Sequence, residues 1–460
     1  MHLLHDHGFV HGKVAELQHH LAAHETAGGL HADGRHVAPH ELAAIREALE
    51  QGRRHEARPG PDPYLARDPL ISLVQSSLHE HAVNKLGPEA VARGDAGVGD
   101  AFTPADIAGW GVDIGLSLIR RLLHGSHRFE DHPAVADLDD TRARLVLFGD
   151  WGTGMADAAG KVIDQVRRHV EPADGEVHVV HLGDTYYSGT PLEARKHVLD
   201  LWPVTARESD RVGSWALNGN HDMYSGGYGY FDTVLGDPRF GRQRSHGRPT
   251  SWFHLKGRRT WDVIGLDTAY QDPVAAFHAG HLFLFGRLGF LHGSQAAYVN
   301  DLGAGPHRRL LLLSHHQLFS AYDSDINKDN VLRDRLRPAL DRTVDAWFWG
   351  HEHNCLAYEP FRGVTAARVI GHGALPTQVR TEPPGTTLNE PHRVVKPTPP
   401  AGAAPDHPVR AVRWEYRDYD EDEDGRRWAK HGYAVVDMSP GALRVRHIDE
   451  NGEVYVDETI

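Results

Sequence analysis

The sequence predicts an α/β fold preceded by a helical extension, and three observations lead to this prediction. From about residue 142, short apolar runs that favour β-strands alternate with helix-like segments, which is typical of an α/β core. Five of these runs end in Gly or Ser beside Asp, Asn or His. Residues 1–140 instead carry helical apolar spacing and no chemical motif.

The N-terminal extension, residues 1–140, is predicted to be mostly helical. Helical spacing of apolar residues occurs in "VAELQHHLAAHE", "PHELAAIREALEQG" and "GLSLIRRLLHG". The stretch "RPGPDPYLARDPL" interrupts these helices, because its prolines forbid a continuous helix. The sequence assigns no role to this extension.

Histidine is unusually frequent: the chain has 36, many of them before residue 140. Metal binding is one interpretation of these histidines. Their spacing does not repeat in the way of a metal-binding motif, in which one pair of ligands is followed by a second pair at a fixed distance. Exposed helical faces and loops are therefore the preferred interpretation.

Residues 141–460 are predicted to form the second unit, whose strands end at polar residues. The expected strands are "ARLVLFGD", "EVHVVHLGD", "GSWALNGNHD", "RRLLLLSHH" and "DAWFWGHEH". Helices are expected in "MADAAGKVIDQVRRHV" and "PLEARKHVLDLW". Ligands of α/β sheets tend to bind in the crevice beyond the strand ends. The five polar strand ends therefore predict one convergent site.

The C-terminal part of this unit is predicted to begin with a surface loop. Residues 380–408 are rich in proline, which prevents a packed core. The acidic run "DYDEDEDG" lacks the register of a calcium loop and is expected to be a solvated turn. The runs "HGYAVVDM", "ALRVRHID" and "GEVYVDE" alternate like strands and are expected to complete a sheet.

Polar side chains at the strand ends form the candidate site. Carboxylate, amide and imidazole donors together suit a metal such as Fe, Zn or Mn, and neighbouring glycines allow sharp turns beside the ions. One aspartate after a strand would be weak evidence, but five such blocks, each closing an apolar run, are much stronger. The residues concerned are Asp150, Asp184, Asn220, His221, His315, His316, His351 and His353.

These blocks, in this order, closely resemble the calcineurin-like metallophosphoesterase family. The family pattern runs D-x-[HG], GD-x-x, GNH[DE], a His after a strand and GHxH, and all of it occurs between Gly149 and His353. The resemblance covers about residues 142–375. It implies a two-sheet α/β sandwich, the calcineurin-like phosphoesterase fold, and leaves the extension and the tail outside.

One position departs from the pattern of many family members. The first block has Gly152 where they have a metal-binding histidine, and the second block offers Tyr187, three residues after Asp184. This combination resembles the purple acid phosphatases, in which a tyrosinate binds ferric iron instead. The resemblance implies that Tyr187 is a metal ligand, that Gly152 leaves space for the phenolate, and that Tyr186 points the other way. A packed aromatic side chain is the alternative for Tyr187.

The resemblance implies a complete dinuclear site. The first ion would be held by Asp150, Tyr187, His353 and Asp184. Asp184 would also bind the second ion and so bridge the two. The other ligands of the second ion would be Asn220, His315 and His351. His221 would hydrogen-bond the phosphate or protonate the leaving oxygen, oriented by Asp222. For His316, substrate contact and a supporting or packing role are both open.

The same resemblance implies hydrolysis of phosphomonoesters by a metal-bound hydroxide, with Fe(III) at the first site and Fe, Zn or Mn at the second. A phosphodiesterase or nucleotide pyrophosphatase with the same metals is the alternative, because specificity depends on the surrounding loops. A non-catalytic scaffold on the same fold is a further alternative. The expected partner is a small phosphorylated substrate, whose identity these motifs do not encode.

Composition restricts the other partners. The net charge of −14 argues against nucleic acid, since phosphate backbones are bound through Lys and Arg. The single cysteine, Cys355, excludes an intrachain disulfide and fits a reducing compartment. No signal peptide and no run of ~20 apolar residues is seen. A cytoplasmic protein without a membrane partner is therefore expected, and a leader removed from the mature chain is left open.

Overall fold

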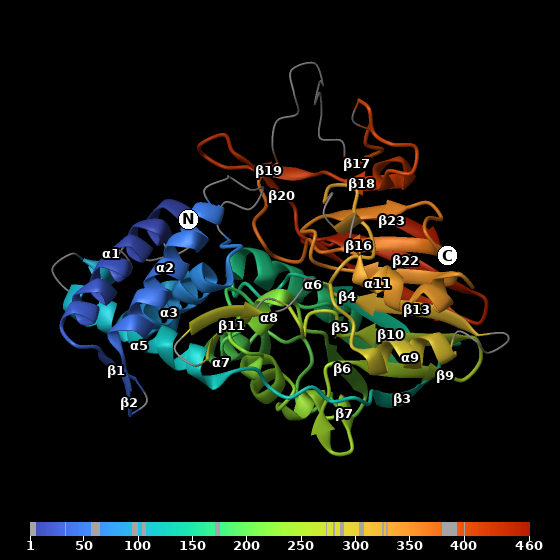
Figure 1. Ribbon diagram of the computed structural model, residues 1–460. Coiled ribbons are helices and arrows are strands. Elements are labelled where there is room, and N and C mark those ends of the chain that lie inside the picture. Colours follow the sequence, from blue (N-terminus) through green and yellow to red (C-terminus); the bar gives the residue numbers. More distant parts are fainter. Residues whose placement is uncertain are drawn as a thin grey trace.

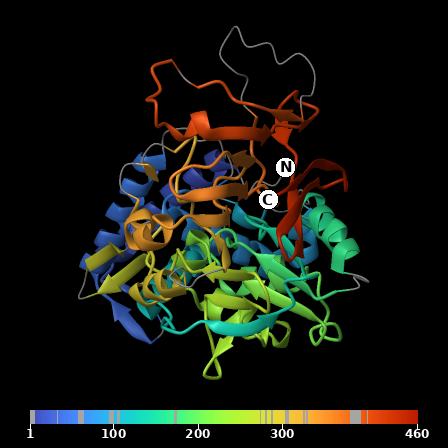
Figure 2. The same cartoon turned by 90° about the vertical axis from the view of Figure 1, so that its right-hand side faces the viewer.

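The computed structural model describes most of the chain. The described residues are 6–32, 34–56, 65–93, 100–103, 107–170, 175–272, 274–278, 281–285, 289–302, 308–323, 326–327, 330–379, 393–399 and 401–460. The N-terminal helices, in blue, lie on one side of two stacked sheets (Figure 1). In the view from the side, the orange strands lie above the green ones (Figure 2).

A nine-stranded sheet and a six-stranded sheet form the core. In spatial order the larger sheet contains β17 (Val394–Val395), β18 (Val412–Tyr416), β15 (Cys355–Tyr358), β16 (Val364–Ile370), β14 (Val344–Trp349), β13 (Arg309–Ser314), β10 (Trp261–Leu266), β9 (Phe253–Gly257) and β3 (Ala134–Leu138). The smaller sheet contains β23 (Val454–Thr459), β22 (Ala442–Asp449), β21 (Gly432–Ser439), β4 (Arg144–Phe148), β5 (Val177–His181) and β6 (Val212–Ala216). Strands β4, β5 and β6 run parallel, as do β10, β13 and β14.

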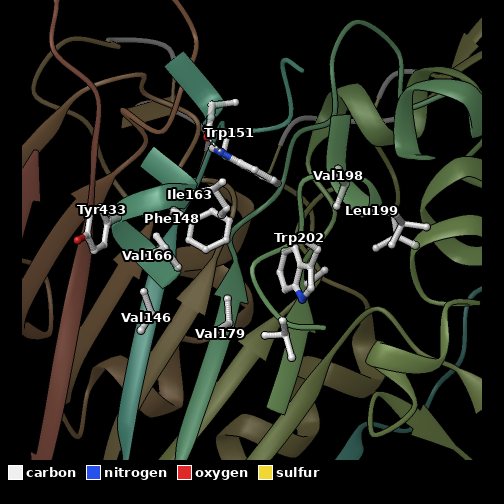
Figure 3. Packing of buried hydrophobic residues seen from close by; sticks show 14 of the residues in the cluster. Val146, Phe148, Trp151, Ile163, Val166, Val179, Val198, Leu199, Trp202 and Tyr433 are labelled. Atoms are coloured by element: carbon white, nitrogen blue, oxygen red, sulfur yellow. Dashed lines mark hydrogen bonds between the residues drawn. The ribbon is translucent and has the colours of Figure 1, made fainter. Parts of the chain in front are cut away.

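The two sheets pack face to face through a shared apolar core. Leu145 and Leu147 of β4 lie in the same buried cluster as Leu313 of β13. The alternate residues Val146 and Phe148 belong to a second cluster on the other face of β4, which the helix α6 (Lys161–Val170) covers (Figure 3). This alternation follows from the two-residue period of a strand. The two-sheet α/β sandwich expected from the sequence is confirmed.

Helices and two-stranded hairpins complete the fold. The remaining α-helices are α1 (His7–Thr26), α2 (Pro39–Glu56), α3 (Pro69–Leu86), α4 (Pro88–Arg93), α5 (Ile107–His124), α7 (Pro191–Glu193), α8 (Asn220–Tyr224), α9 (Gly293–Leu302), α11 (Val331–Arg335) and α12 (Arg337–Leu340). Wider or tighter helical turns are η3 (Asp100–Phe102), η5 (Ala156–Gly160), η6 (Ala194–Leu199), η7 (Gly229–Val234), η8 (Pro238–Phe240) and η9 (Pro408–Ala411). Two-stranded pairs are β1 (Leu30–Ala32) with β2 (Arg35–Val37), β7 (Arg244–Ser245) with β8 (Arg248–Pro249), β11 (Val274–His278) with β12 (His281–Phe285), and β19 (Tyr419–Glu421) with β20 (Arg427–Ala429).

The helical character of the three predicted N-terminal segments is confirmed in α1, α2 and α5. Helix α3, which the sequence analysis did not identify, is buried along its first ten residues, from Pro69 to Leu78. It joins the core of the N-terminal helices to the second unit: Ser72 Oγ donates a hydrogen bond of 2.5 Å to the carbonyl of Tyr187. Strand β3, before residue 140, pairs with β9 of the large sheet. The division at residue 140 stays a prediction.

The C-terminal expectations hold in part: the predicted strands form, but Val394–Val395 of the predicted loop 380–408 form strand β17, which pairs with β18. The three expected strands are β21, β22 and β23. The acidic run, expected to be a turn only, contains strand β19 and the turn that leads to β20. Of the predicted proline-rich loop, residues 380–392 and 400 lie outside the described residues. Among the helices of the described ranges, none combines the length and the apolarity that crossing a bilayer requires.

Candidate metal centre

The predicted strand ends meet at one place. Because the carboxyl ends of parallel strands lie at the same edge of a sheet, β4, β5 and β6 bring their ends together, and β13 and β14 do the same in the facing sheet. The side chains that follow these ends are Asp150, Asp184, Asn220, His315, His351 and His353. The six predicted non-tyrosine ligands therefore come from both sheets of the sandwich.

The backbone at this place is unusual. Asp150, Asp184, His351 and His353 have φ angles of 56°, 76°, 67° and 49°. Only seven non-glycine residues of the described chain have positive φ, and these four are among them. The left-handed region costs energy for side chains with a Cβ, and such strain concentrates at functional sites. The loops thus hold donor side chains in conformations that local preference alone disfavours.

One group of donors centres on His315. Its Nδ1–H donates a hydrogen bond to the carbonyl of Leu182 at 3.0 Å. The lone pair of Nε2 is therefore available to a metal ion. This Nε2 lies 3.1 Å from Asn220 Oδ1, 3.2 Å from His351 Nδ1 and 3.5 Å from Asp184 Oδ1. Ligand atoms about 2.0–2.1 Å from a tetrahedral ion lie about 3.4 Å from one another. The spacing of this group fits ligands around one ion.

A second group adjoins the first. His353 Nε2 lies 3.3 Å from Asp150 Oδ1, and the hydroxyl of Tyr186 lies 3.1 Å from the same oxygen and 3.2 Å from His353 Nε2. Three different donor types thus stand at ligand–ligand separations. Asp184 Oδ2 is buried without a hydrogen-bond partner in the described residues, although buried polar atoms are normally satisfied. The donor set and this orphaned oxygen fit a metal site.

The identity of the tyrosine is a correction to the sequence analysis. Tyr186, expected to point away, places its hydroxyl between Asp150 and His353. Tyr187, expected to be the ligand, shares a small buried cluster with Tyr186, Leu65 and Leu375, and its ring lies 6.3 Å from that of His79 between centroids. Burial, and then the nearby Glu193, raise the pKa of Tyr187 well above its ordinary value. The contacts with Asp150 and His353 thus belong to Tyr186 and do not support Tyr187 as the ligand, whose metal binding stays a prediction.

The requirement for glycine at position 152 also differs from the one expected. Its N–H donates to the carbonyl of Asp184 at 3.3 Å, and its carbonyl accepts from the N–H of Tyr186 at 2.9 Å. A Cβ at position 152 would lie 2.6 Å from the oxygen of Asp184 and 2.9 Å from Thr185 Cα. The missing side chain admits the backbone of the second block rather than a phenolate ring.

Protonation states favour metal binding at these donors. Burial by itself raises the pKa of Asp150, but the hydrogen bond from His353 and the nearby His315 and His351 together lower it to about 2. Asp150 is therefore a carboxylate at neutral pH. Burial and then His315 lower the pKa of His351 well below the ordinary value. His351 is neutral as a result, and its lone pair is available to an ion.

The structure places His221 beside this centre but assigns Asp222 another role. His221 is buried, its ring lies 4.8 Å from that of Tyr186, and its Nδ1–H donates to the carbonyl of Tyr187 at 2.5 Å. Asp222 instead accepts from the N–H groups of Asp184 and Gly219 at 3.0 and 2.8 Å. The expectation that Asp222 orients the imidazole is corrected: a peptide carbonyl does so, and Asp222 holds the loop.

His316 takes a supporting position. It is fully buried, with Nε2 3.2 Å from Asp272 Oδ2 and Nδ1 3.1 Å from the hydroxyl of Thr268. Its ring centroid lies 4.5 Å from that of His351. Of the two alternatives left open by the sequence, this arrangement favours support of the neighbouring ligand over contact with substrate.

The chain is similar to one family model and to several solved structures. Residues 143–355 match the family model of the calcineurin-like phosphoesterases, and the search of curated proteins found no significant match. Among solved structures, the chain is similar to GAP50, the anchor in the inner membrane complex of Plasmodium, with 14% identity, a TM-score of 0.42 and coverage of 70% of this chain and 89% of that one. It is also similar to a dimetal phosphatase from Danio rerio, with 13% identity, a TM-score of 0.41 and coverage of 69% and 98%. The matched residues, 143–355, contain all six non-tyrosine ligand candidates.

Proposed function

We propose that this protein is a dinuclear metal-dependent phosphoesterase that hydrolyses phosphomonoesters. The observation that carries the proposal is the pair of adjoining donor groups, one around His315 and one around Asp150, with Asp184 between them. The family match of residues 143–355 supports the same reaction class. Asp184 is the proposed bridge, because it has a second carboxylate oxygen without a protein partner in the described chain.

Two bound metal ions lower the pKa of water and stabilise the charge that moves between the attacking and leaving oxygens of phosphate. Asp150 and Asp184 contribute two negative charges to the centre. A Tyr186 phenolate and a bound hydroxide would bring the total to four negative charges, so Fe(III) beside a divalent ion would leave a net charge of about +1, which attracts a phosphate dianion. The loops at positive φ hold Asp150, Asp184, His351 and His353 in place before substrate arrives, which reduces reorganisation during the reaction.

Tyr186 is the proposed third donor of the group around Asp150, in place of Tyr187. Its hydroxyl contacts Asp150 and His353 together, so one ion bound by these two side chains would also reach the phenol. A phenolate is a hard, anionic oxygen donor, and we therefore propose Fe(III) for this site and Fe, Zn or Mn for the neighbouring site of imidazole and amide donors.

His221 is the proposed phosphate ligand or acid. Because its Nδ1–H is engaged by the carbonyl of Tyr187, Nε2 is the ring nitrogen left for substrate. Burial lowers the pKa of His221, whereas a phosphate dianion next to the ring favours the protonated form. The protonated Nε2 would donate to a phosphate oxygen or to the leaving oxygen.

The test uses two chromogenic substrates, p-nitrophenyl phosphate and bis(p-nitrophenyl) phosphate, on protein reconstituted with iron and zinc. We expect a higher kcat/KM for the monoester and loss of turnover in Asp184→Asn. The matched control is Asp137→Asn, which changes an exposed carboxylate on β3. A preference for the diester would overturn the monoesterase assignment, and no turnover of either substrate by the metal-loaded protein would overturn the enzymatic one.

A further inference from the structure

We propose a third divalent-metal site, separate from the phosphoesterase centre, formed by His7 and His11 of α1 and Glu56 at the end of α2. The ligand atoms of these three side chains all lie within 4.8 Å of one another. Nitrogen and carboxylate donors in this combination suit zinc. The site would fasten the first helix to the junction between α2 and α3.

The geometry of the three side chains supports a metal ion better than a simple hydrogen bond. His7 and His11 are four residues apart on one helix, so they lie on the same face one turn apart. His11 Nε2 lies 3.3 Å from Glu56 Oε2, longer than the usual charge-assisted hydrogen bond of about 2.7–2.9 Å. It is close to the separation of about 3.4 Å between two ligands of a tetrahedral zinc ion.

The partners of His7 also match those of a metal ligand. Its Nε2–H donates to the carbonyl of Leu65 at 2.9 Å. Metal-bound histidines commonly donate their other ring N–H to such a carbonyl, which orients the ring and fixes its tautomer. Glu56 is oriented in the same manner, because its Oε1 accepts from the N–H of Asp68 at 2.7 Å while Oε2 is directed toward His11.

The buried carboxyl groups at this place favour a bound cation. The Glu56 side chain is only 1% exposed, and burial raises its pKa. The nearby carboxyl of Asp68 is buried too, and burial likewise raises its pKa. In the part of the chain that the structure describes, no Lys or Arg forms an ion pair with Glu56. A divalent ion would supply the positive charge that a buried carboxylate requires.

A continuous set of contacts leads from this site to the phosphoesterase centre. Asp68, whose N–H is held by Glu56, caps the start of α3. One turn further along, Ser72 donates to the carbonyl of Tyr187, the same carbonyl that accepts from His221. The expected role is therefore structural: the ion would hold α1 against the helix that supports the loop of Tyr186 and Tyr187.

The same helix offers a matched comparison. His20 and His24 are also four residues apart, with 3.1 Å between their Nε2 atoms. No carboxylate joins them in a three-ligand group among the described residues. The variant His24→Asn therefore removes a histidine of equal spacing without removing the proposed site.

The experiment measures zinc per chain on the full-length protein, in the Asp184→Asn background so that loss of zinc at the phosphoesterase centre does not enter the comparison. We expect His11→Asn and Glu56→Gln each to lose one zinc ion per chain and His24→Asn to lose none. Zinc should also raise the Tm in the background protein and not in His11→Asn, which gives a readout even where Glu56→Gln does not fold. Equal zinc content and an equal Tm response in all variants would show that His11 and Glu56 form an ion pair only.

Discussion

Replacement of Gly152 by alanine tests how closely the first two blocks of the centre are packed. The new Cβ would stand 2.6 Å from the oxygen of Asp184 and 2.9 Å from Thr185 Cα, and neither atom belongs to a flexible side chain. Overpacking of this kind costs about 1–3 kcal/mol. Opening the contact also weakens the hydrogen bond from the N–H of Tyr186 to the carbonyl of Gly152, worth about 1 kcal/mol. We expect a loss of about 2–4 kcal/mol in the free energy of unfolding.

The same shift would move Asp184, the proposed bridge, so Gly152→Ala should also weaken metal binding by about 10-fold or more. Denaturant unfolding and metal titration measure the two effects. Gly160→Ala is the control, because a Cβ there meets no atom within 4 Å, and alanine in a helix is favoured over glycine by about 0.5–1 kcal/mol. Unchanged stability and metal affinity in Gly152→Ala would refute the close approach on which this reasoning depends.

Three further predictions concern the centre and the sheet beneath it. Tyr186→Phe should abolish the visible absorption band of the iron-loaded protein and Tyr187→Phe should keep it; the reverse result in absorption spectra would restore the original assignment. His221→Asn should leave metal content unchanged and lower kcat by about 10²–10⁴, with a smaller loss for esters of very acidic leaving groups; an equal loss for all esters in steady-state assays would indicate phosphate binding alone. Burial raises the pKa of Glu458, but hydrogen bonds from His447 and Arg368 outweigh it and lower the pKa to about 2, so its stabilisation of about 3 kcal/mol is present above pH 5 and lost as pH falls toward 2. In urea, the free energy of unfolding of Glu458→Gln should be lower than that of the wild type by this amount at pH 7 and equal to it near pH 2. A difference that does not change with pH would contradict the ion pair.

The sheets and most of the proposed metal ligands could be predicted because the end of each strand can be recognised in the sequence. Buried strands such as β4 and β13 are continuous apolar runs, and the residue after the last apolar position lies at the sheet edge by geometry. Asp150 and His315 follow directly from this rule. The rule depends only on the strand, so it holds whatever conformation the following loop adopts.

Residues further along the loops could not be placed in this way. Tyr186 and Tyr187 are neighbours, and which of them reaches Asp150 depends on the path of the backbone between the strand end and α7. Spacing in the sequence carries no information on that path. Asp222 was misassigned for the same reason: its carboxylate turns back to the N–H groups of Asp184 and Gly219.

The N-terminal histidines illustrate a different limit. His7 and His11 show the spacing of a helical pair, but their third partner, Glu56, is 45 residues further along the chain. Only the packing of α1 against α2 brings it near. Helix α3 was missed because its buried serines and glutamine obscure the apolar stripe that helical periodicity relies on.

The most direct test of the dinuclear centre is anomalous scattering from crystals of the protein loaded with Mn²⁺. Two peaks about 3.5–4 Å apart are expected, both within coordinating distance of Asp184, with Asp150, Tyr186 and His353 around one and Asn220, His315 and His351 around the other. A single peak at this place, or none, in protein that is fully folded would contradict the dinuclear centre.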